Sequence, residues 1–208
     1  MLLAKKPWNV LRGLIQRYGT DSVKKTLWDA EFRRGRWDCL DRIPGEVRHP
    51  DVEKYANQGS ILDLGCGPGS TGNELNEDSY QSYTGVDISE SFIQVATQRT
   101  TEYGRSSKNN YVRSDMLTYV PTQMHDVILF GDSIYYIPIN RILPMLRRYS
   151  AYLKNDGVFI ANFYGGTGGR FSLIPAMIES EFDVIDRQRS APSEIRSAVF
   201  RPKNQASV

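Results

Sequence analysis

Residues 60–72, SILDLGCGPGSTG, constrain the fold of this chain more than any other stretch. A short apolar run at 61–64 leads into a dense group of glycines, and residues 73–75 then offer the start of a helix. Glycine allows a positive φ angle and lets a ligand approach the backbone closely, while the free N–H groups of a helix N-terminus face the same ligand. The stretch therefore predicts a strand, a tight turn and a helix that together bind a nucleoside-bearing cofactor.

A flexible surface turn could have the same glycine content, so the surrounding sequence decides between the two. Asp87 ends the next apolar run, 83–86, about 20 residues beyond the turn, where an acid binds ribose hydroxyls in nucleotide-binding folds. An apolar run, a glycine turn and a second run that ends in an acid follow in the order that a cofactor site needs. This order favours the cofactor site over the surface turn.

The chain of 208 residues is 40% hydrophobic and 24% charged, which suits one globular α/β domain with a short extension. Its net charge of +2 argues against a protein dominated by contacts to a phosphate backbone. The N-terminal region still carries a group of basic residues, which form either a local nucleic-acid patch or, as we favour, a solvated helix face. They are Lys24, Lys25, Arg33, Arg34 and Arg36.

The two cysteines, Cys39 and Cys66, and the two histidines, His49 and His125, have neither CxxC nor HxxxH spacing. We therefore expect neither a metal site nor a disulfide framework. Apolar runs stay well short of the roughly 18 to 20 residues of a membrane span, and Lys5 already interrupts the N-terminal one. The prediction is a cytoplasmic protein with no membrane partner.

The N-terminal part shows helical patterns and no strand pattern. Apolar positions between Leu11 and Tyr18 recur with the 3, 4, 7 spacing of an amphipathic helix, and further helices are expected near 23–33 and 51–57. We therefore expect residues 1–57 to form a helical cap that lies on the second domain, residues 58–208, and takes no part in its sheet.

In the second domain, strand and helix patterns alternate. Strands are expected at 60–64, 82–86, 110–113, 126–130 and 157–163, and helices near 71–75, 89–103, 139–153 and 173–181. Alternation of this kind predicts a parallel sheet that is covered on both faces. The runs 183–187 and 196–200 then predict a hairpin at the sheet edge.

Ligands of open α/β sheets bind outside the carboxyl ends of the strands. Among the polar residues and glycines, five follow directly after predicted strands and belong to this edge: Gly65, Asp87, Asp115, Gly131 and Asp132. His125 comes just before a strand, at the opposite edge, so we interpret it as a structural or solvated residue.

Four stretches of the chain resemble the motifs of the class I S-adenosylmethionine-dependent methyltransferases. They are ILDLGCGPG, YTGVDIS, YVRSDML and HDVILFGDSIYY, and the resemblance covers about residues 60–163. It implies an α/β, Rossmann-like three-layer sandwich with a seven-stranded, mostly parallel sheet whose last strand is reversed. It also implies S-adenosylmethionine as cofactor and S-adenosylhomocysteine as product.

The first two motifs imply the methionine and ribose contacts of that cofactor. Asp63 would lie inside the first strand, with Gly65 and Gly67 under the methionine end, and Gly69 would admit the helix. Asp87 would hold both ribose hydroxyls. Cys66 and Ile88, within the same two motifs, complete the cofactor-binding positions expected here.

The last two motifs imply the adenine and methyl contacts. Asp115 would lie near the adenine amino group and Met116 on or beside the ring, whereas without the resemblance Asp115 equally suits a helix N-cap and Met116 a core position. Gly131 and Asp132 would pass the reacting methyl group. Asp132 equally suits a cap of the next helix.

Two other readings of the cofactor motifs remain open. Gly67, Gly69 and Gly72 satisfy the GxGxxG pattern of a nicotinamide dehydrogenase, but Asp63 and Gly65 precede them, and an acid there fits a cationic methionine better than a pyrophosphate. A binding or scaffold protein could also keep the fold without turnover. We favour a methyltransferase.

The expected catalytic positions are Asp132, Tyr135 and Tyr136, with Tyr164 and His49 as further candidates. The tyrosine pair either faces the acceptor beside the methyl group or belongs to the core. From the cap, Tyr18, Trp28 and above all Trp37 offer aromatic surface that can close over the cofactor.

The acceptor is constrained only by exclusion. The fourth motif lacks the Asn/Asp-Pro-Pro-Tyr/Phe pattern of amino-directed nucleic-acid methyltransferases, and neither cysteine has the Pro-Cys context of cytosine-directed ones. We therefore expect a small-molecule acceptor in a biosynthetic pathway, methylated on nitrogen or oxygen, with a peptide or protein as the alternative and nucleic acid disfavoured. The sequence leaves open whether the chain forms a homodimer.

Overall fold

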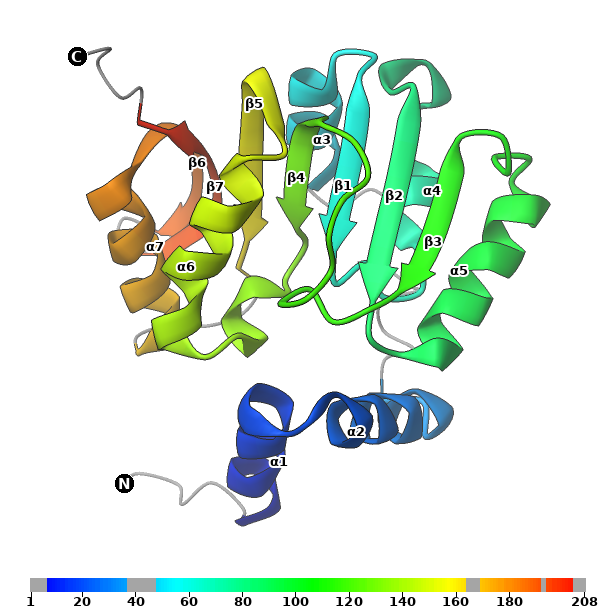
Figure 1. Ribbon diagram of the computed structural model, residues 1–208, viewed down its shortest axis with the longest axis vertical. Helices are drawn as coiled ribbons and strands as arrows, with labels where there is room; N and C mark the ends of the chain where they lie inside the picture. Colours follow the sequence, from blue (N-terminus) through cyan, green and yellow to red (C-terminus); the bar gives the residue numbers. More distant parts are fainter. Residues whose placement is uncertain (1–6, 37–47, 164–168, 192–193, 204–208) are drawn as a thin grey trace.

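The computed structural model describes residues 7–36, 48–163, 169–191 and 194–203. Its centre is a seven-stranded sheet with the order β3-β2-β1-β4-β5-β7-β6 (Figure 1). The strands are β1 (Ser60–Leu64), β2 (Ser82–Asp87), β3 (Asn109–Arg113), β4 (His125–Phe130), β5 (Leu153–Asn162), β6 (Phe182–Ala191) and β7 (Glu194–Pro202). The pairs from β3 to β5 are parallel, whereas β7 is antiparallel to both β5 and β6. The expected Rossmann-like fold with a reversed last strand and a closing hairpin is confirmed.

Helices cover both faces of the sheet and one of its edges. They are α1 (Pro7–Tyr18), α2 (Asp21–Arg33), α3 (Arg48–Ala56), α4 (Ser70–Glu74), α5 (Glu90–Glu102), α6 (Ile139–Ser150) and α7 (Arg170–Glu181), with short 3-10 turns η2 (Glu77–Ser79) and η3 (Ile134–Tyr136). In Figure 1, α6 lies in front of the sheet and α3 behind it, while α1 and α2 lie below the ends of the strand arrows. The helical pair therefore covers the carboxyl edge, where ligands bind in this architecture.

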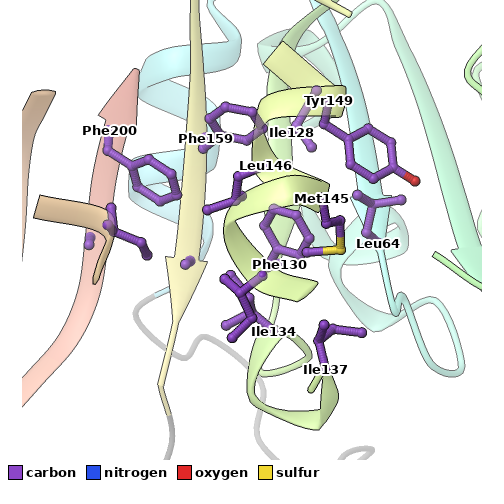
Figure 2. Packing of buried hydrophobic residues seen from close by; sticks show 14 of the residues in the cluster. Leu64, Ile128, Phe130, Ile134, Ile137, Met145, Leu146, Tyr149, Phe159 and Phe200 are labelled. Atoms are coloured by element: carbon purple, nitrogen blue, oxygen red, sulfur yellow. The ribbon is translucent and has the colours of Figure 1, made fainter. Parts of the chain in front are cut away.

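Side-chain alternation divides the core between the two faces. Leu62, Ile128 and Phe130 point to the face covered by α6 and α7, and Figure 2 shows Phe130 against the α6 residues Met145 and Leu146. Ile61 and its neighbours on β4 point to the other face, where Val52 and Ala56 of α3 cover them. Because both faces are buried, the central strands are apolar over most of their length, as is usual in parallel sheets.

The boundary between α6 and β5 differs from the expectation. The helix was expected to reach Leu153 and the strand to begin at Gly157, but α6 ends at Ser150 and β5 begins at Leu153. Leu153 is buried and pairs with His125 at the start of β4. Its apolar side chain therefore belongs to the sheet, although its spacing from α6 also suited a helix.

The apolar positions of α1 do not face the domain. Leu11, Leu14 and Tyr18 are 50%, 48% and 66% exposed, and in this fully described helix only Gln16 is buried. The amphipathic spacing predicted the helix correctly. Three of its four spaced apolar side chains are nevertheless exposed, and Ile15 is half-buried.

His125 lies at the amino end of β4, opposite the carboxyl edge, as expected for a structural residue. Its side chain is almost fully buried, and burial lowers its pKa to about 4, so it is neutral at physiological pH. None of the described helices is long and apolar enough to cross a membrane.

Candidate cofactor and acceptor site

A cavity of about 460 Å³ lies at the carboxyl edge of the sheet, between the strand ends and the helices α1 and α2. Its wall includes the expected cofactor residues Asp63, Gly65, Cys66, Gly67, Asp87, Ile88, Asp115, Met116 and Gly131, and the expected catalytic residues Asp132, Tyr135 and Tyr136. The fold thus brings together side chains from the ends of four strands. Their roles in binding and catalysis remain predictions.

The glycine turn after β1 is fixed by contacts to β2 and to the turn after β4. The N–H of Gly65 donates to the carbonyl of Val86 at 2.7 Å, and the Ser133 hydroxyl donates to the carbonyl of Leu64 at 2.5 Å. Gly65 has a φ of +85°, and a Cβ placed there would lie 2.5 Å from the Ser133 Cβ. Only glycine fits this position, because both the backbone angle and the space exclude a side chain.

Gly67 and Gly69 serve the turn in different ways. Gly67 has a φ of +54° and lines the cavity, and a Cβ built on it would meet no atom within 4 Å. Gly69, with a φ of +78°, is the N-cap residue of α4 and packs closely on Ala96 and Tyr111. Gly67 therefore leaves room for a ligand, whereas Gly69 admits the helix as expected and is not part of the cavity wall.

Asp63 is held at the base of the cavity by a tyrosine. Its carboxylate is 1% exposed, and Oδ2 accepts a hydrogen bond of 2.5 Å from the Tyr83 hydroxyl. Burial, and then the Asp63 charge, raise the pKa of Tyr83 well above its usual value, so Tyr83 remains a donor at physiological pH.

Asp87 ends β2 and is oriented by backbone donors. Its Oδ2 accepts from the N–H of Gly67 at 3.0 Å and its Oδ1 from the N–H of Ser89 at 2.8 Å. Burial raises the pKa of Asp87 to about 6, although these hydrogen bonds oppose the rise. Each oxygen keeps acceptor capacity for a further donor, such as a ribose hydroxyl.

Asp115 uses its two oxygens differently. Oδ1 accepts from the N–H of Leu117 at 2.8 Å and closes a turn after β3, although no helix begins there for Asp115 to cap. Oδ2 accepts from Lys24 Nζ, also at 2.8 Å, and both side chains are buried. The sequence placed Lys24 on a solvated helix face. That expectation is wrong, because α2 turns this lysine into the cavity.

The turn after β4 supplies the expected catalytic positions. Asp132 has a left-handed backbone, with a φ of 55°, and Ser133 rather than Asp132 is the N-cap of η3. No side-chain capping bond forms at η3 or at α6, so the alternative role of Asp132 as a helix cap is not what the structure shows.

Four aromatic side chains from three elements surround the cavity beside Asp132. The rings of Tyr135 and Tyr136 are 4.8 Å apart, Phe171 packs 5.0 Å from Tyr135, and Trp28 of α2 meets Tyr136 edge-on at 5.0 Å. Burial raises the pKa of Tyr136. Both tyrosines are half-buried and line the cavity, and Tyr135 also packs on the core.

Some expected contacts lie outside what the structure describes. Trp37 and Tyr164 fall in ranges that it does not describe, and the side chain of His49 is likewise not described. Trp28, another of the expected aromatic residues of the cap, lines the cavity. Cys66 is buried in the wall, where burial raises the pKa of its thiol.

Sequence reasoning missed several residues of the wall. They include Gln16, Lys24, Pro68, Ser70, Thr71, Phe92, Ser114, Ser133, Ile137 and Phe171. Ser70, Thr71, Ser114 and Ser133 adjoin motif residues and could have been found from their position. Gln16 and Lys24 lie in helices remote from every motif, so only the tertiary structure reveals them.

A protein-family model described as a methyltransferase domain matches residues 61–157, which contain β1 to β4 and the cavity-forming turns after them. Residues 61–157 are therefore a methyltransferase domain, as their resemblance to the class I S-adenosylmethionine-dependent methyltransferases implied. The residues of the site fit the cofactor S-adenosylmethionine, because Gly67 leaves space beside a buried carboxylate, Asp63, and a half-buried one, Asp87, that can accept its donors.

Solved structures with the same fold include other methyltransferases. A TehB-like S-adenosylmethionine-dependent methyltransferase from Corynebacterium glutamicum has a TM-score of 0.65 at 23% identity, with 84% of this chain and 98% of that chain covered. The N-methyltransferase NodS from Bradyrhizobium japonicum, in complex with S-adenosylhomocysteine, has a TM-score of 0.58 at 16% identity and covers 80% and 97%. At these identities the likeness concerns the fold.

One curated relative is an RNA-modifying enzyme. The 18S rRNA (guanine(1575)-N(7))-methyltransferase of Saccharomyces cerevisiae is 28% identical over 115 residues. The match covers 50% of this methyltransferase and only 40% of the yeast protein.

Proposed function

We propose that this methyltransferase transfers a methyl group from S-adenosylmethionine to nitrogen or oxygen of a small-molecule acceptor. The observation that carries the proposal is the cavity, which α1 and α2 cover and which places four aromatic rings beside Asp132. A covered aromatic cavity suits a compact, planar or cationic acceptor better than a folded macromolecule. Residues 1–57 would act as the cap of a catalytic domain formed by residues 58–208.

The proposed cofactor contacts come from three acids of the cavity wall. Asp87 would accept both ribose hydroxyls, Asp63 would face the methionine end near Gly65 and Gly67, and Asp115 would lie at the adenine. S-adenosylmethionine, when bound, supplies an electrophilic methyl group on a sulfonium. Because each of these carboxylates is already oriented by a donor of the protein, little reorganisation is needed on binding.

The remaining wall residues would align the acceptor and exclude water. Methyl transfer is an in-line displacement, so holding the two reactants close in a dry cavity supplies much of the rate. Asp132 would take the proton that a hydroxyl or amine acceptor must lose. Tyr136, whose pKa is raised by burial, would remain a neutral hydrogen-bonding group.

An RNA acceptor is the second candidate, and the yeast relative, whose name specifies 18S rRNA, favours it. The exposed basic residues of α2 and the turn after it, Arg33, Arg34 and Arg36, would then contribute phosphate contacts. A peptide acceptor and a non-catalytic cofactor-binding role are further alternatives. We keep the small molecule first because the cap covers the cavity. A cytoplasmic location in a biosynthetic pathway belongs to the same proposal.

Turnover with a labelled donor tests the proposal. The chain is incubated with S-adenosylmethionine labelled on the methyl group and, separately, with a pool of small metabolites, total RNA and a peptide pool. We expect label to enter the small-molecule fraction. Label only in RNA or peptide would replace the proposed acceptor class, and S-adenosylhomocysteine binding without transfer to any fraction would favour the scaffold.

A further inference from the structure

Three buried hydrogen-bond donors near one end of the cavity have no partner among the described residues. They are Gln16 Nε2, Arg17 Nε and Arg170 Nε. An unpaired buried donor costs about 1–3 kcal/mol, and native proteins rarely tolerate several close together without a reason. Three donors, two of them on guanidinium groups, indicate a missing acceptor.

Gln16 is the best-defined of the three. It is 5% exposed and lines the cavity, whereas Leu11 and Leu14 of the same helix are exposed. Burying Gln16 while these leucines stay exposed does not stabilise α1 through apolar packing. The amide instead provides a donor in the cavity wall.

Arg170 adds its positive charge to the partial positive charge of a helix N-terminus. It is the first residue of α7, a helix of 12 residues with no acidic side chain in its first turn. Its Nη2 donates to the carbonyl of Ile137, which lines the cavity. Burial lowers the pKa of Arg170, and the guanidinium of Arg17 lowers it further. The helix N-terminus and both arginines therefore favour an anion at the same place.

The fold places this group beside the acceptor part of the cavity. Both α1 and α7 contact η3, and the cavity wall there is made by Gln16, Ile137 and Phe171. Arg12, one turn before Gln16, is paired with Glu31. The Glu31 carboxylate is therefore bound to Arg12 and does not pair with Arg17 or Arg170. The Nε donors of Arg17 and Arg170 have no partner among the described residues.

We propose that Gln16, Arg17 and Arg170 bind an oxyanion, a carboxylate or a phosphate, that the acceptor carries. The inference rests on the proposed function and narrows its substrate class to acidic acceptors. An amide and two guanidinium groups match the acceptor lone pairs of such a group, and arginine binds carboxylate and phosphate through paired N–H donors.

Calorimetry on the full chain loaded with S-adenosylhomocysteine tests the site. Benzoate and phenyl phosphate supply the two oxyanions on a ring that suits the aromatic wall, and benzamide is the neutral counterpart of benzoate. We expect at least one oxyanion to bind tenfold or more tightly than benzamide, and the stronger of the two identifies the preferred group. Equal binding of all three probes would overturn the proposal.

Variants then assign the binding to these residues. Arg17→Gln, Arg170→Gln and Gln16→Met should each weaken oxyanion binding about tenfold or more and leave benzamide and S-adenosylhomocysteine binding unchanged. Arg147→Gln is the matched control, because Arg147 is an exposed arginine paired with Glu181. The cofactor titration and a melting curve identify any variant that fails to fold, and Arg170→Lys, which keeps the charge, should then show partial binding. An equal loss in the control would contradict the assignment.

A short single-stranded oligonucleotide separates this inference from the proposed function. In one outcome the oligonucleotide binds and loses affinity in the same three variants, whereas benzoate and phenyl phosphate do not bind. The oxyanion site would then be supported, and the small-molecule function would be contradicted. If S-adenosylhomocysteine binds but neither the oxyanion probes nor the oligonucleotide do, the oxyanion site alone is overturned.

Discussion

Lys24 Nζ lies 2.8 Å from Asp115 Oδ2, and this buried ion pair joins the N-terminal cap to the turn after β3 inside the cofactor cavity. Asp115 is the acid that the family motif assigns to the adenine. The cap is held nearby by Asp29, which accepts from the Ser89 hydroxyl at 2.6 Å at the start of α5. The cap and the adenine end of the site are therefore physically coupled.

The Lys24–Asp115 pair should show strong energetic coupling. Lys24→Met leaves a buried carboxylate without its counter-charge, and such a change costs about 3–5 kcal/mol in the free energy of unfolding. Replacing both partners, in Lys24→Met with Asp115→Asn, removes the uncompensated charge, so the double variant should be more stable than Lys24→Met alone. Urea denaturation of the two single variants and the double variant measures this. Additive losses would mean that the pair is not coupled.

Cofactor affinity should depend on pH through Asp87. Its pKa is raised to about 6, chiefly by burial, and the ribose hydroxyls require the ionised carboxylate as acceptor. Affinity is therefore complete above about pH 7 and falls as the pH drops through 6, by up to about tenfold per unit. 5′-Methylthioadenosine is the suitable probe, since it lacks the titrating amino acid part of the cofactor.

Two controls accompany the pH titration. Asp87→Asn should bind 5′-methylthioadenosine more weakly at pH 8 and lose the dependence between pH 5 and 7. 2′,3′-Dideoxyadenosine, which lacks both ribose hydroxyls, should show little pH dependence with the unaltered chain. A pH dependence that persists in Asp87→Asn would assign the titration to another group.

Gly67→Ala should show whether Gly67 is needed to leave space for the cofactor or only to adopt its backbone angle. Gly67 and Gly104 both have a positive φ, +54° and +70°, and an added Cβ at either would meet nothing within 4 Å, but only Gly67 lines the cavity. Each alanine variant should lose about 1–2 kcal/mol of stability from the left-handed backbone. Only Gly67→Ala should weaken S-adenosylhomocysteine binding, by tenfold or more, in calorimetry. Equal affinities would show that the cofactor does not approach Gly67.

The sheet and the motif side of the cavity could be predicted because their signals are local. Each signal depends on the residues next to it in the sequence. The signals are the apolar run of β1, the glycines that follow it and the acid at the end of β2. Carboxyl ends of parallel strands meet at one edge, so Asp63, Asp87, Asp115 and Asp132 had to converge once the strands were known. The hydrogen bond from the Leu117 N–H to Asp115 is also local to its turn.

The cap side could not be predicted, because its contacts are set by docking and not by local pattern. Lys24 and Asp115 are 91 positions apart, and a lysine at an apparently solvated helix position gives no sign of burial. The burial of Gln16 could not be predicted either. The apolar spacing of α1 predicts a helix but does not indicate which side chain the docked helix buries, and the side chain it buries is Gln16.

Asp132→Asn tests the assigned proton acceptor. Asparagine tolerates the left-handed backbone that Asp132 adopts, with a φ of 55°, and has nearly the same shape, so the fold should be retained. The amide cannot accept a proton, and turnover should therefore fall by about 10²-fold or more, the usual contribution of a general base. S-adenosylhomocysteine affinity should change less than threefold.

Turnover is measured with the acceptor found by the labelled-donor experiment, and Tyr135→Phe, which removes only a hydroxyl from the same wall, serves as the comparison. Unchanged turnover in Asp132→Asn would show that Asp132 is not the proton acceptor.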